Sequence, residues 1–131
     1  MTIRHLKNRH ICLSALSALL WLAGSASAPA QQDQPKKVYV VTYIDVFPNG
    51  AAETASLLTK LAADSLKEPG SVRFESLRDV ERTNHFTVVE VWQTRAAYEA
   101  HQMQEHTKAF RQKIQAYLGS PFDERLYYML Q

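Results

Sequence analysis

The chain has 131 residues, with 15 lysines and arginines against 13 aspartates and glutamates, for a formal net charge of +2. Three of the basic residues, Arg4, Lys7 and Arg9, lie within the first thirty positions, whereas every acidic residue lies beyond them. If that segment is removed, 12 basic residues remain against 13 acidic ones, and the net charge becomes −1. The composition therefore gives no support for a protein that binds nucleic acid.

Segment 1–30 has the pattern of a secretory signal. A basic start precedes an apolar run over residues 11–23, and small residues follow as far as Ala30. Ala28 and Ala30 are the small residues expected just before a cleavage at Gln31. The apolar run is too short to span a bilayer stably, so we expect an exported protein, periplasmic or secreted, with no membrane span after cleavage. The alternative is an uncleaved membrane anchor.

The mature chain is predicted to form one domain without disulfides. The only cysteine, Cys12, lies within the signal, which fits an oxidising compartment. The polar segment 31–37 contains Pro35 and is interpreted as a short tether. About a hundred residues remain after the signal, which is enough for one domain over residues 38–131 with a modest core.

The periodicity of the mature chain predicts six elements. Residues 38–47 alternate as a strand that is largely apolar or aromatic on both faces, and residues 51–67 carry the apolar stripe of a helix. The turn Glu68-Pro69-Gly70 ends that helix. Two strands joined by a polar turn, a long helix and a final strand follow at 72–80, 85–92, 95–118 and 122–130. Thr94 is placed to cap the long helix, which either continues or breaks near Met103.

The order strand, helix, strand, strand, helix, strand predicts an α+β fold. It is the ferredoxin-like βαββαβ arrangement, in which an antiparallel sheet carries both helices on one face. The first strand is nevertheless apolar on both faces, so the face without helices needs another cover. A second subunit packed sheet against sheet is the simplest cover, and we therefore predict a homodimer.

The candidate site lies in residues 86–106, where a strand runs directly into a helix. Glu90 stands between valines on an apolar strand, where a carboxylate is costly unless it is hydrogen-bonded or paired. It serves either in catalysis or substrate orientation, or as a structural carboxylate bound to a helix end or to an arginine of a partner chain. Trp92 ends the strand and is either a core or interface anchor or the wall of a substrate pocket.

The two histidines of this stretch have different interpretations. A spacing of five residues turns about 140° around one helix, so His101 and His106 are not expected to face one point, and no metal site is predicted. His101 is a candidate base, because the pKa of an imidazole lies near neutrality. The alternative is a surface histidine hydrogen-bonded to Glu105 or to backbone. His106 lies on the core stripe with Phe110, which favours a packing role.

Two parts of the chain resemble the antibiotic biosynthesis monooxygenase family. The first is Glu68-Pro69-Gly70-Ser71, followed by the strand that begins at Val72. The second is a strand and the helix after it, marked by Glu90, Trp92, Tyr98, His101, His106 and Phe110. The resemblance extends over residues 37–130 and implies a dimeric ferredoxin-like α/β barrel. Members of the family include cofactor-independent quinol monooxygenases, haem-degrading proteins, proteins that process signalling molecules, and proteins without known activity.

The resemblance implies a monooxygenase that oxidises a quinol-like or polyphenolic aromatic with O₂ and without a bound cofactor. His101 would be the base, and Glu90 would orient that base or the substrate. The substrate-binding residues would be Trp92, Tyr43, Tyr98 and His106. The sequence contains no nucleotide-binding glycine loop or flavin motif, which agrees with chemistry that needs no cofactor.

Two other functions remain open at this point. A non-catalytic, exported dimeric protein would keep the fold and the pocket and would bind a small molecule without turnover. The haem-degrading branch is similar in having a tryptophan and a histidine where this chain has Trp92 and His101. That branch also uses an asparagine in its first strand, where this chain places Tyr43 or a neighbour, and this difference argues against haem degradation.

Overall fold

The computed structural model describes residues 36–130. The predicted signal at 1–30 and most of the predicted tether lie outside the described residues. Within the described range, no helix has both the length and the apolar character needed to cross a membrane.

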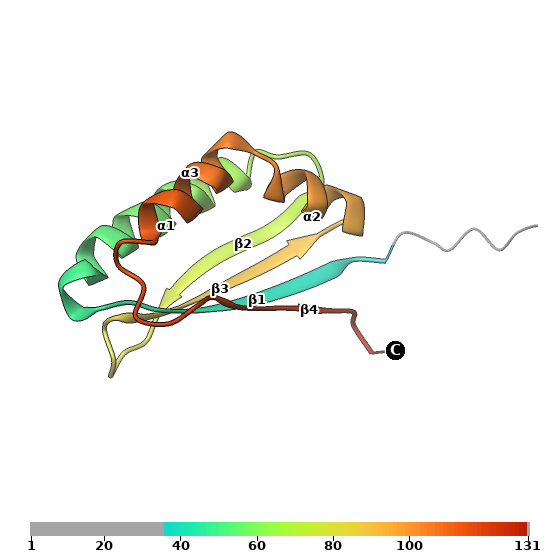
Figure 1. Ribbon diagram of the computed structural model, residues 1–131. Helices are drawn as coiled ribbons and strands as arrows, with labels where there is room; N and C mark the ends of the chain where they lie inside the picture. The colour runs from blue at the N-terminus through green and yellow to red at the C-terminus, as the bar shows by residue number, and fades with distance from the viewer. Residues whose placement is uncertain (1–35, 131) are drawn as a thin grey trace, which may run out of the picture. The chain divides into compact units, whose positions relative to one another are not determined.

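Four antiparallel strands form one sheet (Figure 1). Their order across the sheet is β2-β3-β1-β4, so the first and third strands of the chain lie in the centre. The strands are β1 (Val38–Asp45), β2 (Ser71–Arg78), β3 (His85–Trp92) and β4 (Asp123–Tyr127). β1 pairs with β3 in a register that places Val40 opposite Glu90. The predicted α+β, ferredoxin-like arrangement is confirmed.

The helices cover a single face of the sheet (Figure 1). They are the 3₁₀-helix η1 (Pro48–Gly50) and the α-helices α1 (Ala51–Ser65), α2 (Arg95–Gln102) and α3 (Glu105–Ile114). The hydroxyl of Thr94 accepts the Ala97 N–H at 3.0 Å, so the predicted cap of α2 is confirmed. At the start of α1 the N-cap position belongs to Gly50.

The predicted long helix is divided into α2 and α3. The division falls at Met103 and Gln104, and the backbone of Gln104 is extended, with φ −65° and ψ 145°. An extended residue changes the direction of the chain between the two helices. The spacing rule of one continuous helix therefore does not relate the side-chain directions of α3 to those of α2. This allows His101 and His106 to point toward one another.

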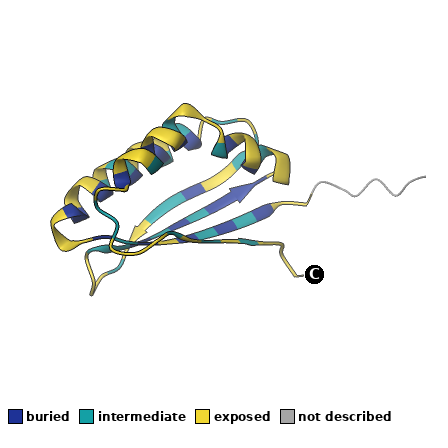
Figure 2. Ribbon diagram, viewed as in Figure 1, coloured by how far each residue is buried: buried dark blue, intermediate teal, exposed yellow. Residues whose placement is uncertain are grey.

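The core lies between the sheet and the helices (Figure 2). The inward positions of the strands are buried, among them Val40, Ile44 and Phe86, and they pack against the buried side of α1 and α3 through Leu58 and Ile114. A small number of buried polar groups from the strands and the helices interrupt this apolar layer, and some of them belong to the candidate site.

Candidate functional site

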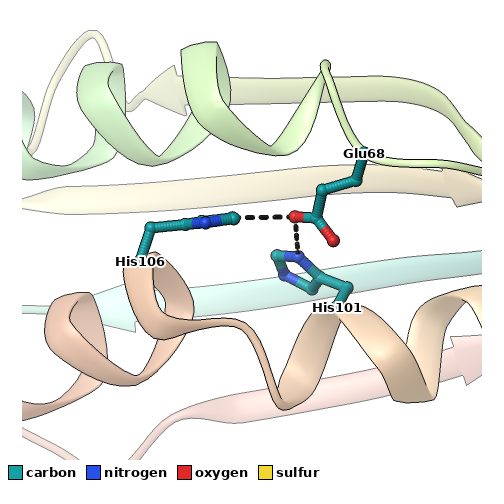
Figure 3. A group of neighbouring side chains, drawn as sticks. All are labelled: Glu68, His101 and His106. Atoms are coloured by element: carbon teal, nitrogen blue, oxygen red, sulfur yellow. Dashed lines mark hydrogen bonds and ion pairs between the residues drawn. The ribbon is translucent and has the colours of Figure 1, made fainter.

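The site forms where the end of β3, the α2–α3 break and the turn after α1 come together. Glu90 points from β3 toward the helices, and His101 lies in the last turn of α2. His106 lies in the first turn of α3, and Glu68 belongs to the turn between α1 and β2. Figure 3 shows Glu68, His101 and His106 pointing toward one another from three separate segments.

One carboxylate oxygen of Glu68 contacts both imidazoles. Oε1 lies 2.7 Å from Nδ1 of His101 and 2.7 Å from Nε2 of His106. An ionised carboxylate only accepts hydrogen bonds, so each of these ring nitrogens carries the proton that it donates. In its neutral form the His101 ring then has an unprotonated Nε2. The hydroxyl of Thr107 lies 3.3 Å from the same Nδ1.

This convergence corrects the expectation that His101 and His106 face different directions. The angle of about 140° applies to one continuous helix, whereas the chain is extended at Gln104 between the two histidines. The ring centroids lie 6.0 Å apart. The nitrogens that contact Glu68 and its oxygen all lie within 4.8 Å of one another, so these three residues could hold a metal ion.

The ring of His101 is held in place by aromatic neighbours. It stacks on Trp92 with centroids 4.7 Å apart and meets the ring of Phe74 edge-on at 5.7 Å. The residue is 2% exposed. Burial lowers the pKa of His101, and the hydrogen bond that its ring donates to Glu68 opposes that effect. His101 therefore favours the neutral imidazole, the form that can accept a proton.

Glu90 lies on the other side of the His101 ring. Its Oε2 accepts the indole N–H of Trp92 at 2.8 Å and lies 4.0 Å from Nε2 of His101. Burial raises the pKa of Glu90 to about 7, the bond from Trp92 opposes the shift, and the negative charge of Glu124 adds to it. Trp92 is fully buried, so its indole serves as the ring support and hydrogen-bond partner of this pair.

A second polar group joins α2, α3 and β4. The hydroxyl of Tyr98 donates to one oxygen of Glu124. The guanidinium of Arg111 donates to the other oxygen at 2.6 Å and to the side-chain oxygen of Gln102 at 2.7 Å. Burial and the Glu124 carboxylate raise the pKa of the Tyr98 phenol above its usual range. Tyr98 therefore stays protonated near neutral pH and acts as a donor.

A cavity of about 20 Å³ lies between these two polar groups. Its polar walls are Thr42, Glu90, His101, Thr107, Arg111 and Glu124, and its apolar walls include Phe110 and Phe122. A volume of this size holds one water-sized molecule. An acid, a base and a guanidinium thus share a small and mostly apolar space, where electrostatic effects are stronger than in water.

The predicted site residues divide into three sets. Glu90 and His101 line the cavity together, and Trp92 supports both from behind. Tyr98 acts on the cavity through Glu124, and His106 contacts the site through Glu68. Tyr43 does not line the cavity. Side chains of a strand alternate between faces, so Tyr43 occupies the face without helices, where it is 46% exposed.

Sequence reasoning did not assign a role to Glu68, Thr107, Arg111 or Glu124. Glu68 directly precedes Pro69-Gly70, and that turn was the local signal available for it. Arg111 and Glu124 lie 13 positions apart on α3 and β4 and meet only in the folded protein. No local spacing marks them as a pair.

The family comparison agrees with this architecture. The family model described as Antibiotic biosynthesis monooxygenase matches residues 37–113, more than half of the chain. The comparison of this chain with curated proteins found no match.

Solved structures of similar fold come from several bacteria. PA3566 from Pseudomonas aeruginosa is 26% identical, with a TM-score of 0.70, over 75% of this chain and 98% of that one. A Nitrosomonas europaea protein provisionally named as an antibiotic biosynthesis monooxygenase is 22% identical, with a TM-score of 0.70, over 74% and 93%. A Bacteroides thetaiotaomicron protein described as a "possible oxidoreductase" is 19% identical, with a TM-score of 0.68, over 72% and 99%. With the extent of the family match, this shows that the chain belongs to the antibiotic biosynthesis monooxygenase family.

Proposed function

We propose that the protein is a cofactor-independent monooxygenase that oxidises an electron-rich phenol of the quinol class with O₂. The observation that carries this proposal is the two-sided environment of His101. Its Nδ1 is tied to Glu68 at 2.7 Å, and its ring borders the cavity beside Glu90. A carboxylate on one ring nitrogen fixes the tautomer and leaves the other nitrogen free to act as a base.

The chemistry begins with removal of a phenolic proton by Nε2 of His101. The resulting phenolate is electron-rich enough to reduce O₂. One oxygen atom enters the ring as a carbonyl and the other leaves as water, with four electrons and two hydrogens supplied by the ring. The protein contributes orientation and a site that excludes water. Arg111 supplies the positive charge that stabilises developing negative charge in the cavity.

The size of the cavity sets a condition on this proposal. A space of about 20 Å³ does not hold an aromatic ring, so a quinol must displace side chains when it enters. Phe122 is the best placed to move, since it is only half-buried and lies in the segment between α3 and β4. The same observation favours a second candidate function, a binding protein that encloses a smaller molecule without turnover.

O₂ uptake by the purified protein with a panel of quinols tests the proposal. We expect turnover above autoxidation, and a loss of about 10²–10⁴-fold in kcat/KM for His101→Asn, because the base is removed. His85→Asn is the matched control: His85 pairs with Asp45 at 2.6 Å, outside the site, so its rate should equal that of the wild type.

A wild-type rate no higher than autoxidation across the panel would overturn the enzyme proposal. Thermal stabilisation by a compound that is not turned over would then support the binding protein. A Soret band on adding haemin would instead support the haem-binding alternative.

We also infer that the protein is exported and works as a homodimer. Export rests on the pattern of residues 1–30. The dimer is supported by the sheet face without helices, on which Tyr39, Val41, Tyr43 and Tyr127 are only partly covered in one protomer. A second copy packed on this face would bury those side chains.

A further inference from the structure

We propose that Glu68, His101 and His106 bind one divalent transition-metal ion of the zinc class. Their three donor atoms, one carboxylate oxygen and two imidazole nitrogens, lie within 4.8 Å of one another (Figure 3). Two imidazoles and one carboxylate are a ligand set that suits zinc, cobalt, nickel or iron(II) and that leaves a fourth position for water.

The two oxygen–nitrogen separations at Glu68 require only a small adjustment. A tetrahedral ion with bonds of about 2.0–2.1 Å sets its donors roughly 3.3 Å apart. The oxygen of Glu68 is 2.7 Å from each ring nitrogen, so each pair must open by roughly 0.6 Å. When the ion binds, the proton that each of these nitrogens now donates to the carboxylate moves to the other nitrogen of the same ring, and the ion takes its place.

The ligands are held on separate, well-supported segments. Pro69-Gly70 fixes the turn that carries Glu68, and the ring of His101 is confined by Trp92 and Phe74. Such support reduces the ordering cost of metal binding. His106 is the most exposed of the three ligands: its side chain is 24% exposed and borders a hollow of about 50 Å³.

An outer partner for the metal-bound imidazole is also present. Metal-ligating histidines usually donate their second ring N–H to a carboxylate, which fixes the ring and strengthens the ligand. If Nδ1 of His101 binds the ion, its proton moves to Nε2, and the carboxylate of Glu90 lies 4.0 Å from that atom. A small rotation of either side chain would complete the hydrogen bond.

This site has a consequence for the proposed monooxygenase, and the consequence rests on that function. The base requires a free Nε2, whereas the metal-bound tautomer carries a proton there. The ion and the phenolic proton therefore compete for the same imidazole. A bound ion would switch the base off, and its removal by a chelator would restore it.

Metal binding is tested without reference to turnover. Tag-free protein is stripped with EDTA and titrated with Co²⁺, whose visible absorption reports the coordination of a zinc-type site, and Zn²⁺ is then added in competition. We expect an absorption band that saturates at one ion per chain and disappears with Zn²⁺. Glu68→Gln and His106→Asn should weaken the binding that produces this band by at least about 100-fold, whereas His85→Asn should leave it unchanged.

A second measurement covers variants that fold poorly. In wild-type protein, the ring NMR signals of His101 and His106 should shift on adding Zn²⁺, and those of His85 should not. No saturable Co²⁺ band, equal binding by folded Glu68→Gln protein, or unmoved histidine signals would show a hydrogen-bonded cluster only and would overturn the proposal. Inhibition of O₂ uptake by Zn²⁺ is a separate readout. If the protein binds Co²⁺ at this site but oxidises no quinol, the result contradicts the proposed function and leaves the metal-site proposal standing.

Discussion

Glu90 is a carboxylic acid placed where its charge is poorly solvated. It is 5% exposed on the inner face of β3, and burial is the main reason that its pKa rises from the usual 4.5 to about 7. Glu124 and Glu68 add to the shift, whereas Trp92 and Arg111 oppose it. The folded protein therefore binds the proton of Glu90 more tightly than the unfolded chain does.

The sign of the resulting pH dependence follows from linkage. The favourable contribution of neutral Glu90 is complete below pH 4.5 and is lost as pH rises to about 7, where the buried carboxylate ionises. Glu90→Gln keeps an oxygen for Trp92 and removes the charge. Relative to wild type, we expect this variant to gain roughly 2.5 kcal/mol in the free energy of unfolding between pH 5 and pH 8. Urea unfolding in EDTA measures the difference, and a difference that does not change with pH would contradict it.

The side chain of Phe122 forms one wall of the cavity and limits its volume. It packs near Phe110, with ring centroids 6.4 Å apart, and under the guanidinium of Arg111. Phe122→Ala should enlarge the cavity and lower the KM for multi-ring quinols more than for single-ring ones. Because the side chain is only half-buried, the loss in unfolding free energy should be about 1–3 kcal/mol, below that of a core phenylalanine. Phe47→Ala, at an exposed position, is the control, and equal changes in KM for both variants would refute the prediction.

The turn between α1 and β2 shows how an element positions the site. Gly70 has φ +84°, and a Cβ at this position would lie 2.6 Å from the Cβ of Ala97 in α2. Its carbonyl also accepts the N–H of Gln93 at 2.8 Å. The turn that carries Glu68 is therefore packed directly on the start of α2, and only glycine fits there without strain.

Gly70→Ala should accordingly destabilise the protein. The backbone strain costs about 1–2 kcal/mol, and the contact with Ala97 adds to it, so we expect a loss of at least about 2 kcal/mol in thermal or urea unfolding. Gly119→Ala is the matched control, because its added Cβ would meet its nearest neighbour at 3.6 Å and its φ is not in the left-handed range. Similar losses for the two variants would argue against this account.

The elements differ in how well the sequence predicts them. The strand that contains Glu90 and Trp92 was predicted with its observed bounds, because its alternating apolar residues end at a capped helix. The sequence left undecided whether the long helix breaks between α2 and α3, because neither Met103 nor Gln104 is a residue that forbids a helix. Tertiary packing decides it, and the meeting of the two histidines at Glu68 could therefore not be derived from helical spacing alone.

At the scale of the whole molecule, the two faces of the sheet differ in what covers them. The face toward the helices contains the site, whereas the other face carries no helix from residues 36–130 (Figure 1). The sequence carried this information, because the first strand is apolar on both sides. It could not show which outward residues stay half-covered in one protomer, since that depends on the register of neighbouring strands.

The proposed dimer is tested on that outer face. Val41 lies in the middle of β1, a central strand, and is partly covered in one protomer. Val41→Lys would place a charge in a sheet-to-sheet interface, where an unpaired charge is strongly unfavourable, but would leave it near water in a monomer. We expect light scattering after size exclusion to show a dimer for wild type and a folded monomer for Val41→Lys. Gln112→Lys adds the same charge at an exposed position of α3 and should remain dimeric. A monomeric wild type, or equal behaviour of the two variants, would mean that the outer face is not the interface between subunits.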